Sequence, residues 1–194
     1  MKKKLQLALM SLFLLLNVSV EAQMCDGCDG LRYQTPVFSN VDVDLEVQYG
    51  NAVQPTIFNP NGTTDLGVDI YQPAGDTLCA RPLIIWAFGG AFVAGDRKSP
   101  DIVAFCEKLA LKGYVAVSMQ YRLEPNQINL LIAEAMVKAV MRSVQDGYQV
   151  VNFLRADANG ENTYGIDPDQ IFAGGASAGG FVANHLAYMD PSDP

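Results

Sequence analysis

The chain has 194 residues, of which 49% are hydrophobic and 18% charged, so its composition is that of a globular protein with material for one sizeable core. Its formal net charge is −8, from 13 basic and 21 acidic residues. Because an acidic surface repels phosphate backbones, we expect no nucleic-acid partner. The charge does not select among neutral ester or sugar substrates.

The first 22 residues have the pattern of a secretory signal peptide, with lysines at 2–4, an apolar run over 5–20, and Ala22 as the expected cleavage site. The apolar run has about 16 residues, fewer than the roughly 20 that a membrane-spanning helix needs. We therefore expect a secreted or periplasmic protein without a stable membrane span after signal removal. Its mature form would have 10 basic and 20 acidic residues and a formal charge of −10.

Four cysteines in an exported chain permit disulfides, and three full pairings are possible for Cys25, Cys28, Cys79 and Cys106. The sequence does not select one of them. Cys25 and Cys28 form a CxxC motif, but a zinc site needs a second ligand pair and a redox motif needs a strand-to-helix context. We interpret them as a structural or flexible thiol pair, and expect no metal or other cofactor.

Residues 23–40 are interpreted as an N-terminal extension, and the pattern of a folded domain begins at Val41. From Val41 to Tyr49 apolar and polar residues alternate strictly, which predicts a half-buried strand at a sheet edge. Asn61-Gly62 marks a turn, and alternation returns over 66–71 until Pro73. These two segments predict an antiparallel hairpin.

The expected domain, a partial one, covers residues 41–194. After the hairpin it alternates buried strands and helices. Continuous apolar runs predict buried strands, and apolar residues at steps of three and four predict helices. The expected strands are 83–88, 114–119 and 171–173, and the expected helices are 100–112, 133–154 with an interruption near Gly147, and 181–188. This order predicts a mostly parallel sheet with helices on both faces. Residues 159–169 are expected to be a turn-rich connection.

The segment 175–179 reads GASAG, which matches G-x-S-x-G at a point where a predicted strand turns sharply into a helix. The serine at such a turn has a strained backbone, and the flanking glycines let the strand and the helix approach closely. This context predicts that Ser177 is a nucleophile. A second glycine segment, 88–92 (FGGAF), follows the first buried strand, where backbone N–H groups can face a developing oxyanion.

Together the two motifs resemble those of the hormone-sensitive-lipase and type B carboxylesterase groups of esterases and lipases in the α/β-hydrolase superfamily. The resemblance covers residues 41–188 and includes the matching segments 95–96, 121–123 and 165–169. It implies an α/β-hydrolase sandwich: a mostly parallel sheet with an antiparallel N-terminal hairpin and helices on both faces, with its C-terminal part missing.

The resemblance implies that Ser177 accepts the acyl group, and that the backbone N–H groups of Gly90, Ala91 and Ala178 form the oxyanion hole. One departure is visible, because these families commonly open the glycine loop with histidine and Phe88 stands there instead. Since the donors are backbone groups, we expect the loop to be preserved with a different bracing.

The acid and histidine of a triad are not found in the chain. These families place them many tens of residues after the nucleophile, whereas 17 residues follow Ser177, so Asp190 and Asp193 lie too close to it. His185, the only histidine, lies on the same predicted helix, about 12 Å from Ser177 along the axis, whereas a base must approach within about 3 Å. We interpret it as an ordinary helix residue.

Two explanations fit this absence: an N-terminal fragment of a longer esterase, which we favour, or a shortened homologue without activity. The fragment alone should be poorly stable and almost inactive. The expected activity of the parent protein is hydrolysis of a small-molecule or glycan-borne carboxylic ester through a serine acyl-enzyme. A serine peptidase or thioesterase of the same fold, or a non-catalytic binding module on this scaffold, are the alternatives. The sequence does not indicate an oligomeric state.

Overall fold

The computed structural model describes residues 30–56, 58–126, 129 and 131–189. Its compact unit is 31–194, which is described here by itself. The predicted signal peptide over 1–22, with Cys25 and Cys28, lies outside the described residues. In the described part of the chain no helix is long and apolar enough to cross a membrane, and no cluster of His, Cys, Asp or Glu could hold a metal ion.

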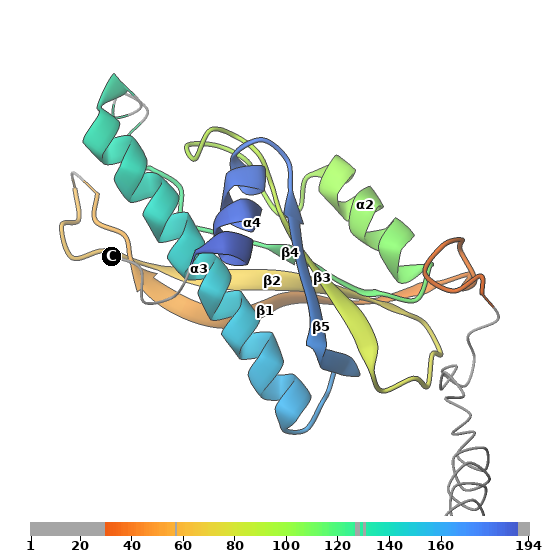
Figure 1. The fold of residues 1–194 in the computed structure, drawn as a ribbon. Coiled ribbons are helices and arrows are strands. Elements are labelled where there is room, and N and C mark those ends of the chain that lie inside the picture. The colour runs from red at the N-terminus through yellow and green to blue at the C-terminus, as the bar shows by residue number, and fades with distance from the viewer. Residues whose placement is uncertain (1–29, 57, 127–128, 130, 190–194) are drawn as a thin grey trace, which may run out of the picture. The chain divides into compact units, whose positions relative to one another are not determined.

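Within the described residues, one sheet holds five strands in the order β1-β2-β4-β3-β5 (Figure 1). Their bounds are β1 Val41–Val53, β2 Thr63–Pro73, β3 Arg81–Ala87, β4 Val115–Met119 and β5 Ile166–Gly175. Strand β2 is antiparallel to both β1 and β4, whereas β3 is parallel to β4 and β5. Four strands therefore run in one direction and β2 runs against them, which confirms a mostly parallel sheet that begins with an antiparallel hairpin.

Strand β1 is an edge strand, as its alternation predicts, but it is more exposed than expected. Val43 is 39% exposed and Leu45 is 62% exposed. The pairing with β2 shifts register between Asp44 and Val47, where Glu46 has a φ of 58°. A bulge of this kind inserts an extra residue and changes the face that later side chains occupy. Strict alternation in the sequence therefore does not place all the apolar residues of β1 on the core.

In the part of the chain that the structure describes, three helices cover this sheet: α2 (Pro100–Ala110), α3 (Ala133–Asn159) and α4 (Ala178–Tyr188). Helix α2 joins β3 to β4, and α3 joins β4 to β5 on the other side of β3. Since both crossovers are right-handed and move in opposite directions along the sheet, the two helices lie on opposite faces. Helix α4 packs beside α3 (Figure 1). The prediction of helices on both faces is confirmed.

Strand β5 begins earlier than predicted. Residues 166–169, expected within a turn-rich connection, are extended and belong to β5. Arg81 pairs with Ile166, but Leu83 pairs with Ile171, so the strand accommodates its polar segment in an irregular stretch of the ladder. Except for Ile166, residues 166–170 are half-buried or exposed. Their polar composition is therefore compatible with a strand here, although it resembles that of a loop.

Helix α3 differs from its prediction in two ways. It is continuous through Gly147, because this residue lies where Leu186 of α4 packs: a Cβ there would be 2.8 Å from the Leu186 Cδ1 atom. Its apolar stripe is also shared between two contacts, since Tyr148 and Val151 line a cavity between α3 and α4 rather than facing the sheet. Val137 is 61% exposed. An apolar stripe predicts a buried face, but it does not distinguish a sheet from a neighbouring helix.

The layer between α3 and the sheet contains a buried ion pair. Arg122, just past the end of β4, donates from Nη2 to Asp146 of α3 over 2.7 Å, and its backbone N–H also donates to this carboxylate over 2.7 Å. Arg122 further donates to the carbonyl oxygen of Val53. Asp146 is fully buried, so the pair replaces water with fixed partners on both charges. It fixes the segment after β4 to the long helix.

Asp146→Ala should lower the free energy of unfolding by about 3–5 kcal/mol, because it leaves the Arg122 guanidinium buried without its carboxylate. The matched control is Glu134→Ala, which removes another acidic residue of α3 whose partner Lys138 is exposed with it. Its effect should be close to zero. Urea unfolding of both variants measures the difference, and equal effects would show that the buried pair does not stabilise the fold.

Candidate active site

Ser177 occupies the sharp turn between β5 and α4. Its φ is 50° and its ψ is −113°, a conformation that is strained for any residue with a Cβ. The residue is exposed, and its side chain makes no hydrogen bond to the first turn of α4, although it stands at the N-cap position. The turn thus presents the serine at the surface instead of using its hydroxyl to cap the helix.

The two glycines of the motif lie at the closest backbone contacts of this turn. A Cβ on Gly175 would be 2.3 Å from the carbonyl carbon of Gly179, and a Cβ on Gly179 would be 2.1 Å from the carbonyl oxygen of Ala87. The N–H of Ala176 also donates to the oxygen of Ala87 over 3.2 Å. The G-x-S-x-G spacing is therefore required by the packing of α4 against the ends of β5 and β3.

The predicted glycine loop follows β3 and has an unusual backbone. Gly90 has a φ of 134°, and the next two residues, Ala91 and Phe92, have φ values of 52° and 62°. The carbonyl oxygen of Gly90 accepts hydrogen bonds from the N–H groups of Val93 and Ala94. The loop is thus a tight turn in which two residues with side chains adopt the left-handed region.

The loop and the turn at Ser177 are in direct contact. A Cβ on Gly89 would be 2.9 Å from the carbonyl oxygen of Ala176 and 3.3 Å from the Ser177 Cβ. This follows from the topology, because β3 and β5 are parallel neighbours and their carboxyl ends lie at the same edge of the sheet. Two motifs that lie 88 residues apart, at Gly89 and Ser177, therefore form one site.

Three backbone N–H groups are available at this site. Within the described residues, those of Gly90, Ala91 and Ala178 donate no hydrogen bond. Ala178 is the first residue of α4, where the helix dipole favours negative charge. The arrangement can hold an anionic oxygen beside the serine hydroxyl. The assignment of Ser177 as nucleophile and of the three N–H groups as oxyanion donors stays a prediction.

His185 is bound to its own helix. Its Nδ1 atom lies 2.7 Å from the carbonyl oxygen of Phe181, and the residue is half-buried. This contact agrees with its interpretation as an ordinary helix residue.

The segment that follows the glycine loop is anchored at Arg97 by a buried carboxylate. Asp69 of β2 is fully buried and lies 3.2 Å from the Nε of Arg97. Beside it on β4, Ser118 donates its hydroxyl to the carbonyl oxygen of Arg97 over 2.6 Å. Asp69 also accepts the N–H of Glu46 at the β1 bulge. Asp69 and Ser118, both buried, therefore fix the chain at Arg97, just after the glycine loop.

Several residues that support the site were not among the residues predicted from the sequence. Asp69 and Asp146 are fully buried acids within apolar patterns, and an acid at such a position is the signal that could have identified them. Tyr121 is also buried, and its ring stacks on Phe88 with centroids 4.2 Å apart. The expected change of bracing at Phe88 is thus an aromatic stack.

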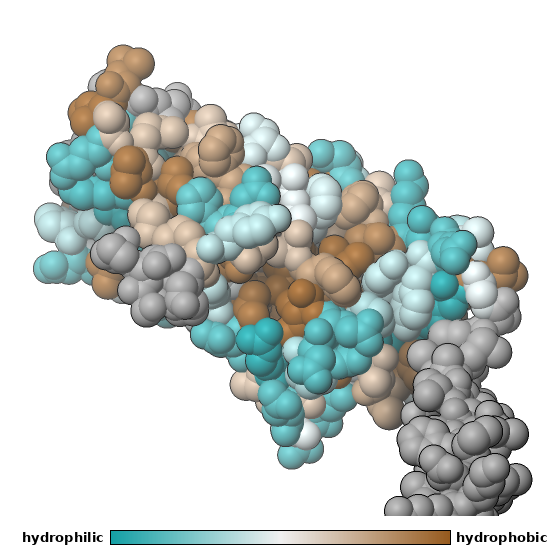
Figure 2. Space-filling model, viewed as in Figure 1, coloured by the Kyte–Doolittle hydropathy of each residue, from teal (hydrophilic) through white to brown (hydrophobic). Residues whose placement is uncertain are grey.

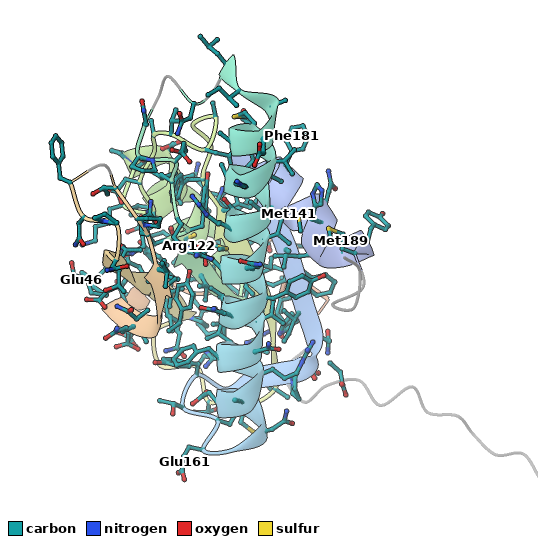
Figure 3. The ribbon with its side chains drawn as sticks, turned by 90° about the vertical axis from the view of Figure 1, so that its left-hand side faces the viewer. Glu46, Arg122, Met141, Glu161, Phe181 and Met189 are labelled. Carbon is teal, nitrogen blue, oxygen red and sulfur yellow. The ribbon has the colours of Figure 1, made fainter. Side chains whose placement is uncertain are left out.

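The described cavities do not enclose the serine. The one of about 580 Å³ lies between α3 and α4, bounded by residues that include Met141 and Met189 (Figure 3). The two elements that flank the turn each expose a large apolar side chain: Phe172 of β5 is 53% exposed and Phe181 of α4 is 60% exposed. Figure 2 shows hydrophobic residues in the middle of this face, where β5 lies in Figure 1.

Free thiols stand at both described cysteines. Cys79 is exposed and Cys106 is buried in α2, and neither is bonded to the other. Burial raises the pKa of the Cys106 thiol to about 12, which makes it a poor nucleophile at neutral pH. The described cysteines therefore do not compete with Ser177 for the role of nucleophile.

Comparison with known proteins identifies relatives of this fold. Residues 68–193 match the family model described as BD-FAE. An AB hydrolase superfamily protein of Schizosaccharomyces pombe is 27% identical over 164 residues, and a probable carboxylesterase of Arabidopsis thaliana is 27% identical over 158 residues. Among solved structures, the thermophilic esterase Est2 of Thermogutta terrifontis with bound propionate is 25% identical and superposes with a TM-score of 0.54.

The similarity extends over most of this chain but over a smaller part of the relatives. It covers 82% and 78% of the chain for the two sequence relatives, and 40% and 43% of their own lengths. The match to Est2 covers 82% of this chain and 51% of that enzyme. The chain therefore spans about half the length, or less, of the proteins that it resembles.

Comparing Gly179→Ala with Gly180→Ala shows whether the close backbone contact at Gly179 excludes a side chain, or whether any added methyl group in this turn has the same effect. A Cβ on Gly180 would meet its nearest heavy atom, the Gly175 oxygen, at 3.4 Å. Gly179→Ala should destabilise the protein by about 1–3 kcal/mol or more, whereas Gly180→Ala should be neutral or stabilising by up to about 1 kcal/mol. Thermal and urea unfolding measure both. Similar stabilities for the two variants would contradict the contact geometry.

Proposed function

Because the chain belongs to the BD-FAE family and has the fold of α/β-hydrolase esterases and lipases, we propose that it carries the nucleophile of a serine-dependent carboxylic ester hydrolase. The observation that supports this most strongly is the contact between Gly89 and Ser177. It brings a strained, exposed serine beside backbone N–H groups that donate no hydrogen bond. Acyl transfer requires a nucleophile beside donors that can stabilise an oxyanion.

In the proposed reaction, the Ser177 Oγ attacks the ester carbonyl carbon while a base removes its proton. The N–H groups of Gly90, Ala91 and Ala178 stabilise the negative charge on the former carbonyl oxygen. Collapse of this intermediate expels the alcohol, which takes up the proton, and leaves an acyl group on Ser177. Water then attacks the acyl-enzyme by the same route and releases the carboxylic acid.

We propose that the base and its acidic partner follow Pro194 in the gene product. The partial coverage of the relatives supports this, because the chain corresponds to 40–51% of their lengths. The bond of His185 to the Phe181 carbonyl also supports it, since this ring is engaged within α4. On this proposal residues 41–194 are the first part of the hydrolase domain, and the chain alone turns over little substrate.

The proposed substrate is a small-molecule or glycan-borne ester, met outside the cytoplasm after removal of residues 1–22. The similarity to a probable carboxylesterase and to an esterase with bound propionate supports an ester substrate. Residues 23–40 are then a short N-terminal extension of the mature protein.

Ser177→Ala in the complete protein should lower kcat for a p-nitrophenyl ester by at least about a thousand-fold, because it removes the atom that forms the acyl-enzyme. Ser39→Ala is the control, since Ser39 is exposed and precedes the sheet. Stopped-flow and steady-state assays at saturating substrate measure both variants. Turnover by Ser177→Ala within ten-fold of the unsubstituted protein would reject Ser177 as the nucleophile.

A further inference from the structure

The two ends of the glycine loop are held by one short segment that follows β4. The hydroxyl of Tyr121 donates to the carbonyl oxygen of Phe88 over 2.7 Å. The backbone N–H of Glu124 donates to the carbonyl oxygen of Phe92 over 2.6 Å. Since Phe88 and Phe92 flank residues 89–91, these two bonds fix the loop on both sides of the N–H groups assigned to the oxyanion site.

The ring of Tyr121 contacts the same two residues. It stacks on Phe88 with an interplanar angle of 16°, and it meets Phe92 edge to face, with centroids 6.3 Å apart. All three side chains are buried. Aromatic pairs in these geometries are attractive beyond the area that they bury. Tyr121 thus contacts both ends of the loop: its hydroxyl and ring contact Phe88, and its ring also contacts Phe92.

The loop requires such support because of its backbone. Ala91 and Phe92 both have positive φ values, at 52° and 62°. Residues with side chains remain in this region only where surrounding contacts fix them there. The burial of Phe92 against Tyr121 is the contact that opposes relaxation of this strain.

The carbonyl that accepts from Tyr121 also lies against the turn at the nucleophile. A Cβ on Gly179 would be 2.6 Å from the oxygen of Phe88. This oxygen therefore lies between the Tyr121 hydroxyl and the first turn of α4. Its position sets the plane of the peptide that joins Phe88 to Gly89, and Gly89 is the residue in contact with Ser177. A rotation of this peptide would move the following N–H groups relative to the serine.

Tyr121 is itself well fixed. The next residue, Arg122, is held by the buried carboxylate of Asp146 through its side chain and its backbone N–H. Burial also raises the pKa of the Tyr121 hydroxyl above its ordinary value, so the hydroxyl is protonated and able to donate at neutral pH. A rigid, protonated donor is suited to define the position of a carbonyl group.

We propose that Tyr121 is a positioning residue for acyl transfer: its hydroxyl bond to the Phe88 carbonyl sets the position of the oxyanion N–H groups of Gly90 and Ala91 relative to Ser177. This inference rests on the proposed function. It assigns to Tyr121 an effect on the transition state, where negative charge develops, and little effect on the binding of an uncharged ester.

The test is Tyr121→Phe in the complete protein, which keeps the buried ring and removes the hydroxyl. We expect kcat for a p-nitrophenyl ester to fall about ten-fold or more, with KM changed less than about three-fold, because a small displacement of oxyanion donors affects mainly the transition state. Replacement of Tyr121 by p-aminophenylalanine, which retains a donor at the same place, should restore kcat. Failure of this folded variant to exceed the kcat of Tyr121→Phe would overturn the inference.

The matched control is Tyr49→Phe. The Tyr49 hydroxyl donates to the carbonyl oxygen of Gln120, so this variant loses a comparable bond one residue away from Tyr121 without touching the loop. We expect a similar fall in melting temperature for the two phenylalanine variants, and an unchanged kcat for Tyr49→Phe alone. Equal falls in kcat would overturn the inference and leave the proposed function intact. Absence of ester hydrolysis by the unsubstituted protein would instead overturn the proposed function, and this inference with it.

Discussion

The site depends on one steric constraint: the backbone at the start of α4 lies against the carbonyl groups at the end of β3. No side chain fits at Gly175 or Gly179, where a Cβ would lie 2.1–2.3 Å from backbone atoms. This approach places Ser177 beyond the edge of the sheet, strained and exposed. It also brings the glycine loop after β3 against the serine, which neither motif could achieve alone.

The remaining contacts hold that loop in place from behind. The segment after β4 is fixed by the buried pair of Arg122 and Asp146, and it holds the loop through Tyr121. After the loop, Asp69 and the hydroxyl of Ser118 hold the chain at Arg97. Two of the buried ion pairs of this domain thus lie beside the segments that hold one functional loop. We infer that they maintain its strained backbone as well as the stability of the fold.

The order of elements and the two glycine motifs could be predicted from the sequence, because turns, apolar runs and G-x-S-x-G are local patterns. Their contact could be inferred from the parallel order of strands. The bulge at Glu46, the uninterrupted helix at Gly147 and the buried role of Asp146 could not, because each depends on a partner distant in sequence. Phe88 shows the same limit: its departure from the family pattern was visible, whereas its stacking partner Tyr121 was not.

The central claim is that Ser177 is activated beside an oxyanion site formed by backbone N–H groups. A crystal structure of the complete protein after reaction with a phosphonate ester tests it most directly. The account predicts a covalent bond from Ser177 to phosphorus, with the phosphoryl oxygen about 2.7–3.1 Å from the nitrogens of Gly90, Ala91 and Ala178. An unmodified serine, or an adduct whose oxygen points away from these three nitrogens, would contradict it.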